Sequence, residues 1–236
     1  MAGMEREYDP IQPRGTDWRG LLRRIWAPIG AAIVLIAKFS FAALKFFSIF
    51  IAVAGYALIW GWRFAVGFVL LILVHELGHF FEARRQGLHA TWPTFIPFFG
   101  AYVLVKDAPL NPWRNALVSL AGPAYGGLAA AACWVVGEAA NSNLMRALAY
   151  AGFLINLINL LPIGILDGGS VWRSIKLARH SVEPPAGQQF AMGSTYPIAI
   201  PGGGPTRAVQ IGVLYGLLAT LLLIGMIATH VTQHRL

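Results

Sequence analysis

Two histidines and a glutamate lie close together in one strongly apolar stretch of the sequence, the run HELGH at residues 75–79. Residues four positions apart share one face of an α-helix, so the ring nitrogens of His75 and His79 can bind the same metal ion. Glu76 follows the first histidine and can act on a water molecule at that metal. Imidazole pairs at this spacing are typical of catalytic zinc sites. The first hypothesis is therefore a zinc site on a helix.

The residues around this run indicate that the helix lies in a membrane. The stretch from Phe64 to Val74 contains no charged residue, and charges return only at Glu82, Arg84 and Arg85. Ionisable side chains at membrane depth are costly and are kept mainly where they have a function. A chance match to the motif would leave three such groups without a purpose, so we favour the functional interpretation.

The composition supports an integral membrane protein. Hydrophobic residues make up 57% of the 236 residues and charged residues only 12%, far from the composition of a typical soluble domain. The formal net charge of +8 comes from basic residues near the N-terminus and in loops, a pattern typical of anchoring to anionic lipid on the cytoplasmic side. We therefore expect a lipid bilayer as partner and no nucleic acid. The single cysteine, Cys133, excludes an intrachain disulfide.

The elements that must position the motif are predicted to be helices. We expect an all-α polytopic membrane protein with about five to six transmembrane helices. The expected spans are residues 48–62, 64–84, 113–136, 144–161 and 208–229, and the amphipathic segment 26–45 either lies at the membrane surface or forms a sixth span. A short membrane-associated extended segment is predicted near residues 91–105, because proline and glycine interrupt β-favouring residues there.

The predicted organisation is one membrane-embedded domain. Residues 1–25 are expected to form a cytoplasmic N-terminal tail, and residues 26–236 a single membrane-embedded domain whose core, with the chemistry of the motif, covers about 64–169. The polar, Pro- and Gly-rich region 173–206 is interpreted as a cytoplasmic loop. If the N-terminus is inside, the chain is a multi-pass membrane protein, and the motif lies in the cytoplasmic half of the bilayer.

A catalytic zinc site needs a third protein ligand besides the two histidines and an open position for water. The polar candidates that could supply it are Glu82, His89, Asp107, Glu138 and Asp167. Asp167 is favoured, because it lies in a helix-breaking, glycine-rich segment at a depth that matches the histidines. Irregular backbone at membrane depth is tolerated only where it is buried in protein or lines a polar cavity.

Two motifs together resemble those of the site-2 protease family of intramembrane zinc metalloproteases. HELGH is followed by Asn159-Leu160-Leu161-Pro162 and then by Leu166-Asp167-Gly168, in the order and on the separate segments that this family shows. The resemblance implies one Zn²⁺ bound by His75, His79 and Asp167. It further implies that Glu76 is the general base, and that Asn159 holds the substrate or the developing oxyanion.

One position departs from the pattern of that family. Many members have Gly-Pro-x-x-Asn in the intervening helix, whereas here Gly122-Pro123-Ala124-Tyr125 is followed by Gly126. We expect Gly126 to permit close packing of helices. Asn156 is interpreted as a residue that forms a hydrogen bond between helices.

The expected function is an intramembrane zinc metalloendopeptidase that hydrolyses transmembrane or membrane-anchored proteins. The substrate must be extended to expose its carbonyl group, and an edge of the segment 91–105 could pair with it. Two alternatives are a membrane metal transporter and a non-catalytic relative that binds membrane segments. Glu76 distinguishes them, because a transporter has little need of a base beside the metal ligands.

Overall fold

The computed structural model describes residues 18–96, 100–106, 111–182 and 198–233. Its contacts divide the chain into two compact units, Met1–Leu44 and Lys45–Leu236. The second unit holds every residue of the predicted site. The predicted tail boundary near residue 25 stays a prediction, and most of that tail lies outside the described residues, as does the candidate Asp107.

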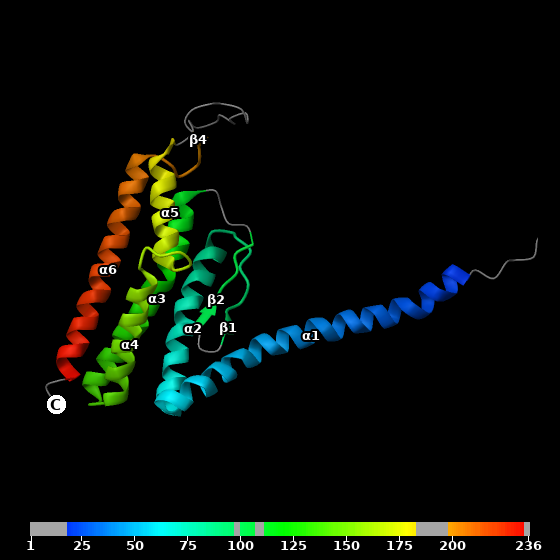
Figure 1. Cartoon of the computed structure of the whole chain (residues 1–236), viewed down its shortest axis with the longest axis horizontal. Coiled ribbons are helices and arrows are strands. Elements are labelled where there is room, and N and C mark those ends of the chain that lie inside the picture. The colour runs from blue at the N-terminus through cyan, green and yellow to red at the C-terminus, as the bar shows by residue number, and fades with distance from the viewer. Residues whose placement is uncertain (1–17, 97–99, 107–110, 183–197, 234–236) are drawn as a thin grey trace, which may run out of the picture. The chain divides into compact units, whose positions relative to one another are not determined.

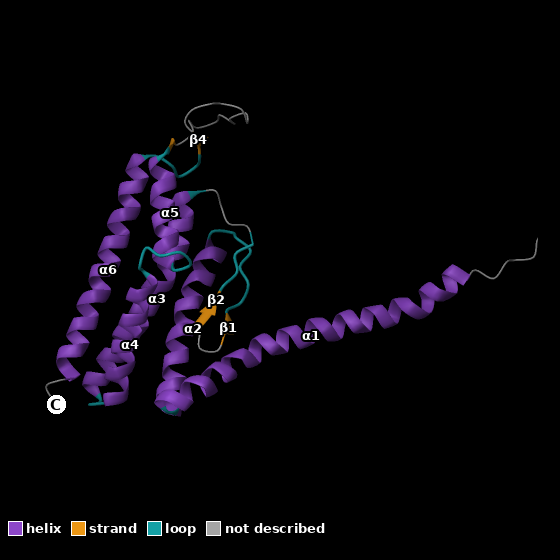
Figure 2. Ribbon diagram, viewed as in Figure 1, coloured by secondary structure: helices purple, strands orange, loops and turns teal. Residues whose placement is uncertain are grey.

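The described chain is mainly helical, as predicted (Figures 1 and 2). Its helices are α1 (Trp18–Trp60), α2 (Trp62–Arg85), α3 (Pro112–Ala139), α4 (Asn143–Asn159), α5 (Asp167–Arg179) and α6 (Pro205–Gln233). Its strands are β1 (Thr94–Ile96) and β2 (Gly100–Tyr102), which pair antiparallel, and β3 (Ser181–Val182) and β4 (Ile198–Ala199), which pair parallel.

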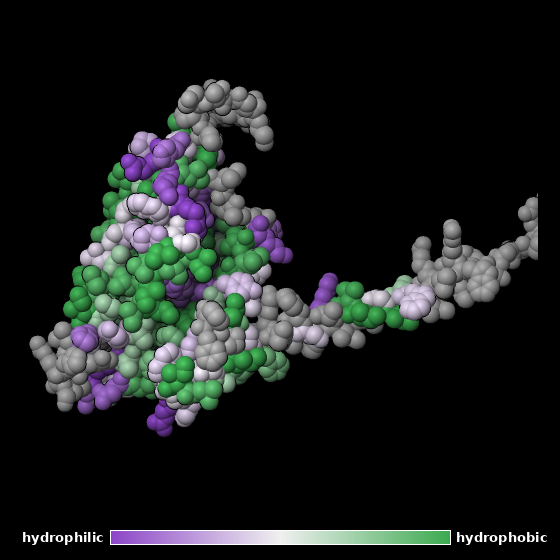
Figure 3. Space-filling model, viewed as in Figure 1, coloured by the Kyte–Doolittle hydropathy of each residue, from purple (hydrophilic) through white to green (hydrophobic). Residues whose placement is uncertain are grey.

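Three of the described helices are long and apolar enough to cross a membrane: Trp62–Arg85, Pro112–Ala139 and Pro205–His230. The predicted five to six spans are not confirmed in this part of the chain. The reason is length, because α4 has only 17 residues and the apolar stretch Phe47–Trp60 is shorter still. Hydrophobic side chains cover the middle of the bundle face in Figure 3, and hydrophilic ones gather where α5 ends.

The ends of the helices follow from local sequence. Gly61 adopts a positive φ of 80° between α1 and α2, a backbone conformation that glycine reaches without strain. The side chain of Asn111 accepts a hydrogen bond from the backbone N–H of Arg114 and caps α3, with Pro112 at the first helical position. Ser142 caps α4 in the same way. α3 continues through Pro123 without a break.

The central helix of the bundle is α3, which contacts α2, α4, α5 and α6. α4 ends at Asn159, close to the predicted break at Pro162, and α5 continues beyond it in the same direction after the segment 160–166 (Figure 1). Asp167 is the first residue of α5 and follows this segment directly.

The prediction that residues 173–206 form a loop is wrong for the described residues 173–179, which belong to α5, and 205–206, which begin α6. Val171, Ser174 and Ala178 recur at helical spacing and are buried, whereas the charged residues of α5, Arg173, Lys176 and Arg179, are exposed together with Trp172 and Leu177. A short amphipathic helix of low mean hydropathy resembles a polar loop when only its composition is considered.

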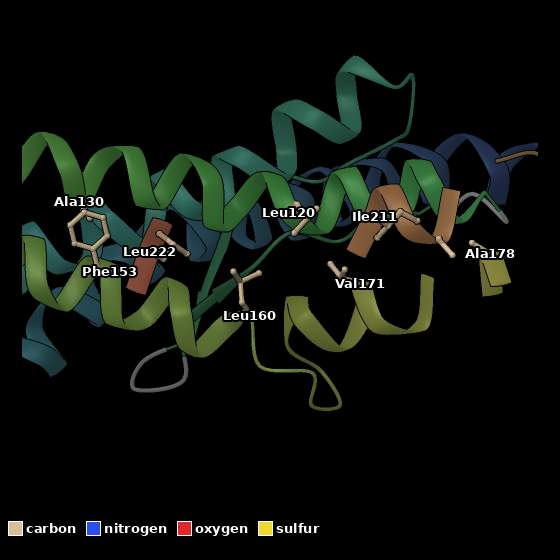
Figure 4. Packing of buried hydrophobic residues seen from close by; sticks show 10 residues of the cluster. Leu120, Ala130, Phe153, Leu160, Val171, Ala178, Ile211 and Leu222 are labelled. Carbon is tan, nitrogen blue, oxygen red and sulfur yellow. The ribbon is translucent and has the colours of Figure 1, made fainter. Parts of the chain in front are cut away.

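Two apolar clusters hold the second unit together. One joins α3, α4, α5 and α6 through residues such as Leu120, Phe153, Leu160 and Val171, which Figure 4 shows packed between the helices. The other joins the end of α1 to α2, β1 and α4. Because Leu160 begins the segment 160–166 and Val171 follows it in α5, burial of both holds the start of α5 against α3.

The predicted extended segment is confirmed as a hairpin of β1 and β2. The hairpin is continued by an isolated bridge between Ala90 and Val105. Phe95 donates its backbone N–H to the Ser48 hydroxyl at 3.2 Å, which ties β1 to the end of α1. β2 contacts α2, the helix of the metal motif.

Candidate metal centre

The two motif histidines lie on one face of α2, as their spacing predicts. Their Nε2 atoms are 3.1 Å apart, and the rings meet nearly edge to face. His75 is buried, and His79 is partly buried.

Asp167 comes to the same point from α5. Its Oδ2 atom lies 3.2 Å from Nε2 of His75, and its Oδ1 atom lies 3.2 Å from Nε2 of His79. Among the described residues, these three form the one group of at least three potential metal ligands whose atoms all lie within 4.8 Å of one another. The structure thus brings together the three residues that the sequence predicts as ligands.

Two of the other candidates lie elsewhere. Glu82 forms an ion pair with Arg85 near the end of α2. Glu138 pairs with Arg146 at the turn between α3 and α4. His89 lies on the hairpin segment and is not part of the ligand group.

Hydrogen bonds place a proton on Nδ1 of both imidazole rings. Nδ1 of His79 lies 2.8 Å from the carbonyl oxygen of Val118, which can only accept, so this nitrogen donates. Nδ1 of His75 lies 2.7 Å from Oδ1 of Asn156 and donates in the same way. Each neutral ring therefore directs the lone pair of Nε2 toward Asp167. This tautomer is the one that binds a metal through Nε2.

The donor set fits a zinc ion. Tetrahedral zinc with bonds of about 2.0–2.1 Å places its ligand atoms about 3.3–3.4 Å apart, close to the separations of 3.1 and 3.2 Å found here. Three electron-rich atoms facing one another call for a cation between them.

Two glycines make room for the site, a role that the sequence did not reveal. A Cβ atom on Gly122 of α3 would lie 2.2 Å from Nε2 of His79, inside the volume of the ring. A Cβ atom on Gly78 would lie 2.5 Å from the carbonyl oxygen of Ala121, so this glycine lets α2 and α3 approach closely. Both contacts join distant parts of the chain, so they could not be read from local sequence. The only local sign was that Gly122 directly precedes Pro123.

A cavity of about 750 Å³ opens onto the three ligands. Glu76 lines it and is buried, with its carboxyl group close to the backbone of Val103. Asn159, the last residue of α4, lines the same cavity. Residues of β2 form part of the wall. All five residues predicted for the site therefore border one space.

The segment 160–166 is held in place from both sides. Tyr215 of α6 donates its hydroxyl to the carbonyl oxygen of Leu160 at 2.5 Å. Arg173 of α5 donates to the carbonyl oxygen of Gly164 at 2.7 Å and to the hydroxyl of Ser170 at 2.7 Å. These bonds fix the backbone between Asn159 and Asp167.

Comparison with known protein families identifies the chain. The model of peptidase family M50 matches residues 63–141 and 137–200, more than half of the sequence. The chain belongs to peptidase family M50. The match covers α2, the hairpin, α3, α4 and α5, and so includes every residue of the candidate metal centre.

Two members with curated descriptions share recognisable sequence with this M50 chain. "Putative zinc metalloprotease Rip3" of Mycobacterium tuberculosis is 31% identical over 147 residues, which cover 57% of this chain and 37% of that protein. "Putative zinc metalloprotease sll0528" of Synechocystis is 31% identical over 109 residues, covering 44% of this chain and 28% of that protein. The chain thus spans about a third of the length of these relatives.

The family match confirms the resemblance seen in the two motifs. The predicted enzyme class, a zinc metalloprotease, is also the class that the descriptions of both relatives name. Together with three helices apolar enough to span a bilayer, it supports a membrane metalloprotease.

Proposed function

We propose that this chain is an intramembrane zinc metalloendopeptidase that cuts transmembrane or membrane-anchored proteins. The observation that carries the proposal is the convergence of His75, His79 and Asp167, with ligand atoms 3.1–3.2 Å apart, on a cavity that Glu76 also lines. This arrangement supplies three protein ligands and leaves room beside them, as a catalytic zinc site requires.

The chemistry divides between the metal and the protein. Zinc, when bound, supplies the Lewis acidity that brings the pKa of a water molecule toward neutrality. Glu76 takes up the proton of the attacking water and passes it to the leaving amine, because its carboxylate lies beside the ligands and inside the cavity. The role of the three ligands His75, His79 and Asp167 is to hold the metal in place during the reaction.

Asn159 is proposed to bind the substrate or the oxyanion that develops at the scissile carbonyl. In support, Asn159 is the last residue of α4 and lines the same cavity as Asp167. A donor in this role contributes about 10²–10³ in rate in other enzymes. Tyr215 and Arg173 keep the adjoining backbone rigid, as such a role requires.

The substrate is proposed to enter as an extended strand beside β2. A helical peptide bond is already hydrogen-bonded and covered, so it must unwind before attack. β2 pairs with β1 on one side, and its residues Gly100, Ala101 and Tyr102 line the cavity. Backbone pairing along β2 would direct an extended substrate past Glu76.

The test combines metal analysis with cleavage of a single-span substrate by the purified protein. The wild type should hold about one zinc per chain and cleave. Glu76→Gln should keep the zinc and lose about 10²–10⁴ in rate, because it removes only the base. Asp167→Ala should lose the zinc together with activity.

Two outcomes would contradict the proposal. A Glu76→Gln variant that cleaves normally would exclude this residue as the base. A wild type that binds zinc but cuts no membrane substrate would favour a metal transporter or a non-catalytic relative.

A further inference from the structure

We infer that Asn156 is a positioning residue for the metal centre, and that Gly126 provides the space its side chain needs. The amide of Asn156 would hold the ring of His75 in the tautomer and orientation that present Nε2 to the metal. This inference rests on the proposed zinc site and adds a residue pair to it.

Asn156 is completely buried on α4, with 0% of its surface exposed. A buried amide is costly unless its polar atoms find partners. Its Nδ2 donates to the carbonyl oxygen of Gly152 at 2.7 Å, and its Oδ1 accepts from Nδ1 of His75 at 2.7 Å. The amide therefore connects the backbone of α4 directly to a predicted metal ligand on α2.

The directions of these bonds follow from one another. The carbonyl of Gly152 can only accept, so the NH₂ group of Asn156 must face it. The amide oxygen must then face His75, and Nδ1 of His75 must carry the proton. The proton-free nitrogen of the ring is thereby Nε2, 3.2 Å from Oδ2 of Asp167. A backbone carbonyl on α4 thus determines, through Asn156, which ring atom can bind a metal.

Gly126 on α3 lies against the Asn156 amide and leaves the space that this amide occupies. A Cβ atom at position 126 would lie 2.2 Å from Oδ1, 2.6 Å from Nδ2 and 2.7 Å from Cγ of Asn156. Any side chain at 126 would occupy the volume of the Asn156 amide. The two positions are therefore coupled, because one space beside His75 admits a side chain from α3 or from α4 but not from both.

The experiment measures the zinc dissociation constant of the purified full-length chain in detergent, by competition with a chelator. Asn156→Ala should weaken zinc binding about 10- to 100-fold, the usual effect of removing a partner of a ligating histidine. Asn156→Asp should weaken zinc binding less than Asn156→Ala, because its carboxylate can still accept the hydrogen bond from His75 although it cannot donate to the carbonyl oxygen of Gly152. Asn143→Ala is the matched control, because Asn143 is an asparagine of the same helix whose side chain accepts a hydrogen bond from Arg146 and not from His75. The zinc affinity of this variant should equal that of the wild type.

A second set of variants tests the coupling. Gly126→Asn alone should weaken zinc binding, because the new side chain displaces the amide of Asn156. Adding Asn156→Ala to it should restore much of the affinity, since an amide from α3 then fills the space beside His75. If the double variant loses as much zinc-binding free energy as the two single variants together, the two positions are not coupled and this part of the inference is wrong.

The inference and the proposed function fail in different ways. If the wild type binds zinc and Asp167→Ala does not, yet Asn156→Ala binds zinc as tightly as the wild type, Asn156 only joins the helices and the inference is wrong. In that case the variant would lower the unfolding temperature of the metal-free protein and leave the zinc affinity unchanged. If the wild type itself binds no zinc, both ideas are wrong.

Discussion

At the scale of single residues, the metal centre depends on acceptors that cannot change their protonation. Nδ1 of His79 donates to a backbone carbonyl and Nδ1 of His75 to an amide oxygen. A carboxylate in either place could share the imidazole proton, whereas these neutral acceptors leave it on Nδ1. Both Nε2 atoms therefore stay available, and the charge of the ligand set comes from Asp167 alone.

Gly122 should be essential for the position of His79. Gly122→Ala places a methyl group where the ring now lies, so we expect zinc affinity to fall at least about tenfold, comparable to the loss of an outer partner. In an unhindered helix the same exchange stabilises by about 0.5–1 kcal/mol. Gly212→Ala provides that control, because nothing lies within 4 Å of its added Cβ atom.

Chelator competition on both variants checks this prediction. Unchanged zinc binding by Gly122→Ala would mean that the ring of His79 can move without loss, and that α3 does not limit the site.

Local spacing allowed the site residues to be predicted, but not the residues that support them. His75, Glu76 and His79 follow from one helical turn, and Asp167 from a broken segment at matching depth. Asn156 was correctly interpreted as a residue that bonds between helices, yet its partner lies 81 positions away, so its link to a metal ligand could not be predicted. Gly126 was expected to allow close packing, and the structure shows that the group it admits is the Asn156 amide.

At the scale of elements, the site exists because α4 and α5 are two helices and not one. An uninterrupted helix would carry residue 167 along the regular path of α4, whereas the segment 160–166 interrupts the helix before α5 continues in the same direction. Gly168 makes this possible, since a Cβ atom there would lie 2.0 Å from the carbonyl oxygen of Leu160. The break was predictable from Pro162, but the helix after it was not, because its Gly-Gly start and charges resemble those of a loop.

The outer edge of β2 should contribute to substrate binding. Neighbouring residues of an antiparallel strand alternate in the direction of their N–H groups, so of Ala101 and Tyr102 one donates toward β1 and the other away from it. A proline at the outward position removes a donor without breaking the hairpin. We therefore expect that one of the two variants, Ala101→Pro or Tyr102→Pro, keeps its zinc but has a KM raised about two- to tenfold. This change corresponds to the free energy of one lost hydrogen bond.

Ala101→Val and Tyr102→Phe keep the backbone N–H and serve as controls for the changed side chains. KM is measured on a single-span substrate, and zinc content reports the integrity of the site. If both proline variants retain zinc and an unchanged KM, pairing of substrate with β2 is excluded.

At the scale of the whole second unit, basic residues are distributed unequally between the two ends of the bundle. α3 has 28 residues and is about 42 Å long, more than the roughly 30 Å of a bilayer core, so its ends should lie at opposite membrane surfaces. At one end, Arg63 lies at the start of α2, and Arg146 in the first turn of α4 is buried and paired with Glu138. The opposite end, where α2 and α5 terminate and α3 and α6 begin, carries Arg84, Arg85, Arg114, Lys176, Arg179 and Arg207.

This asymmetry predicts the orientation of the protein. Basic residues favour the cytoplasmic side, so the end of α5 should face the cytoplasm and the turn between α3 and α4 the outside.

The orientation can be tested by cysteine labelling in a Cys133→Ser background. A membrane-impermeant maleimide added to intact cells should label Ala140→Cys but not His180→Cys, and it should label both variants after permeabilisation. Both positions are exposed, and neither exchange alters a basic residue that determines topology. The reverse labelling pattern would mean that the bundle has the opposite orientation in the membrane. Labelling of both positions in intact cells would mean that α3 does not cross the membrane, which would contradict a site enclosed by lipid.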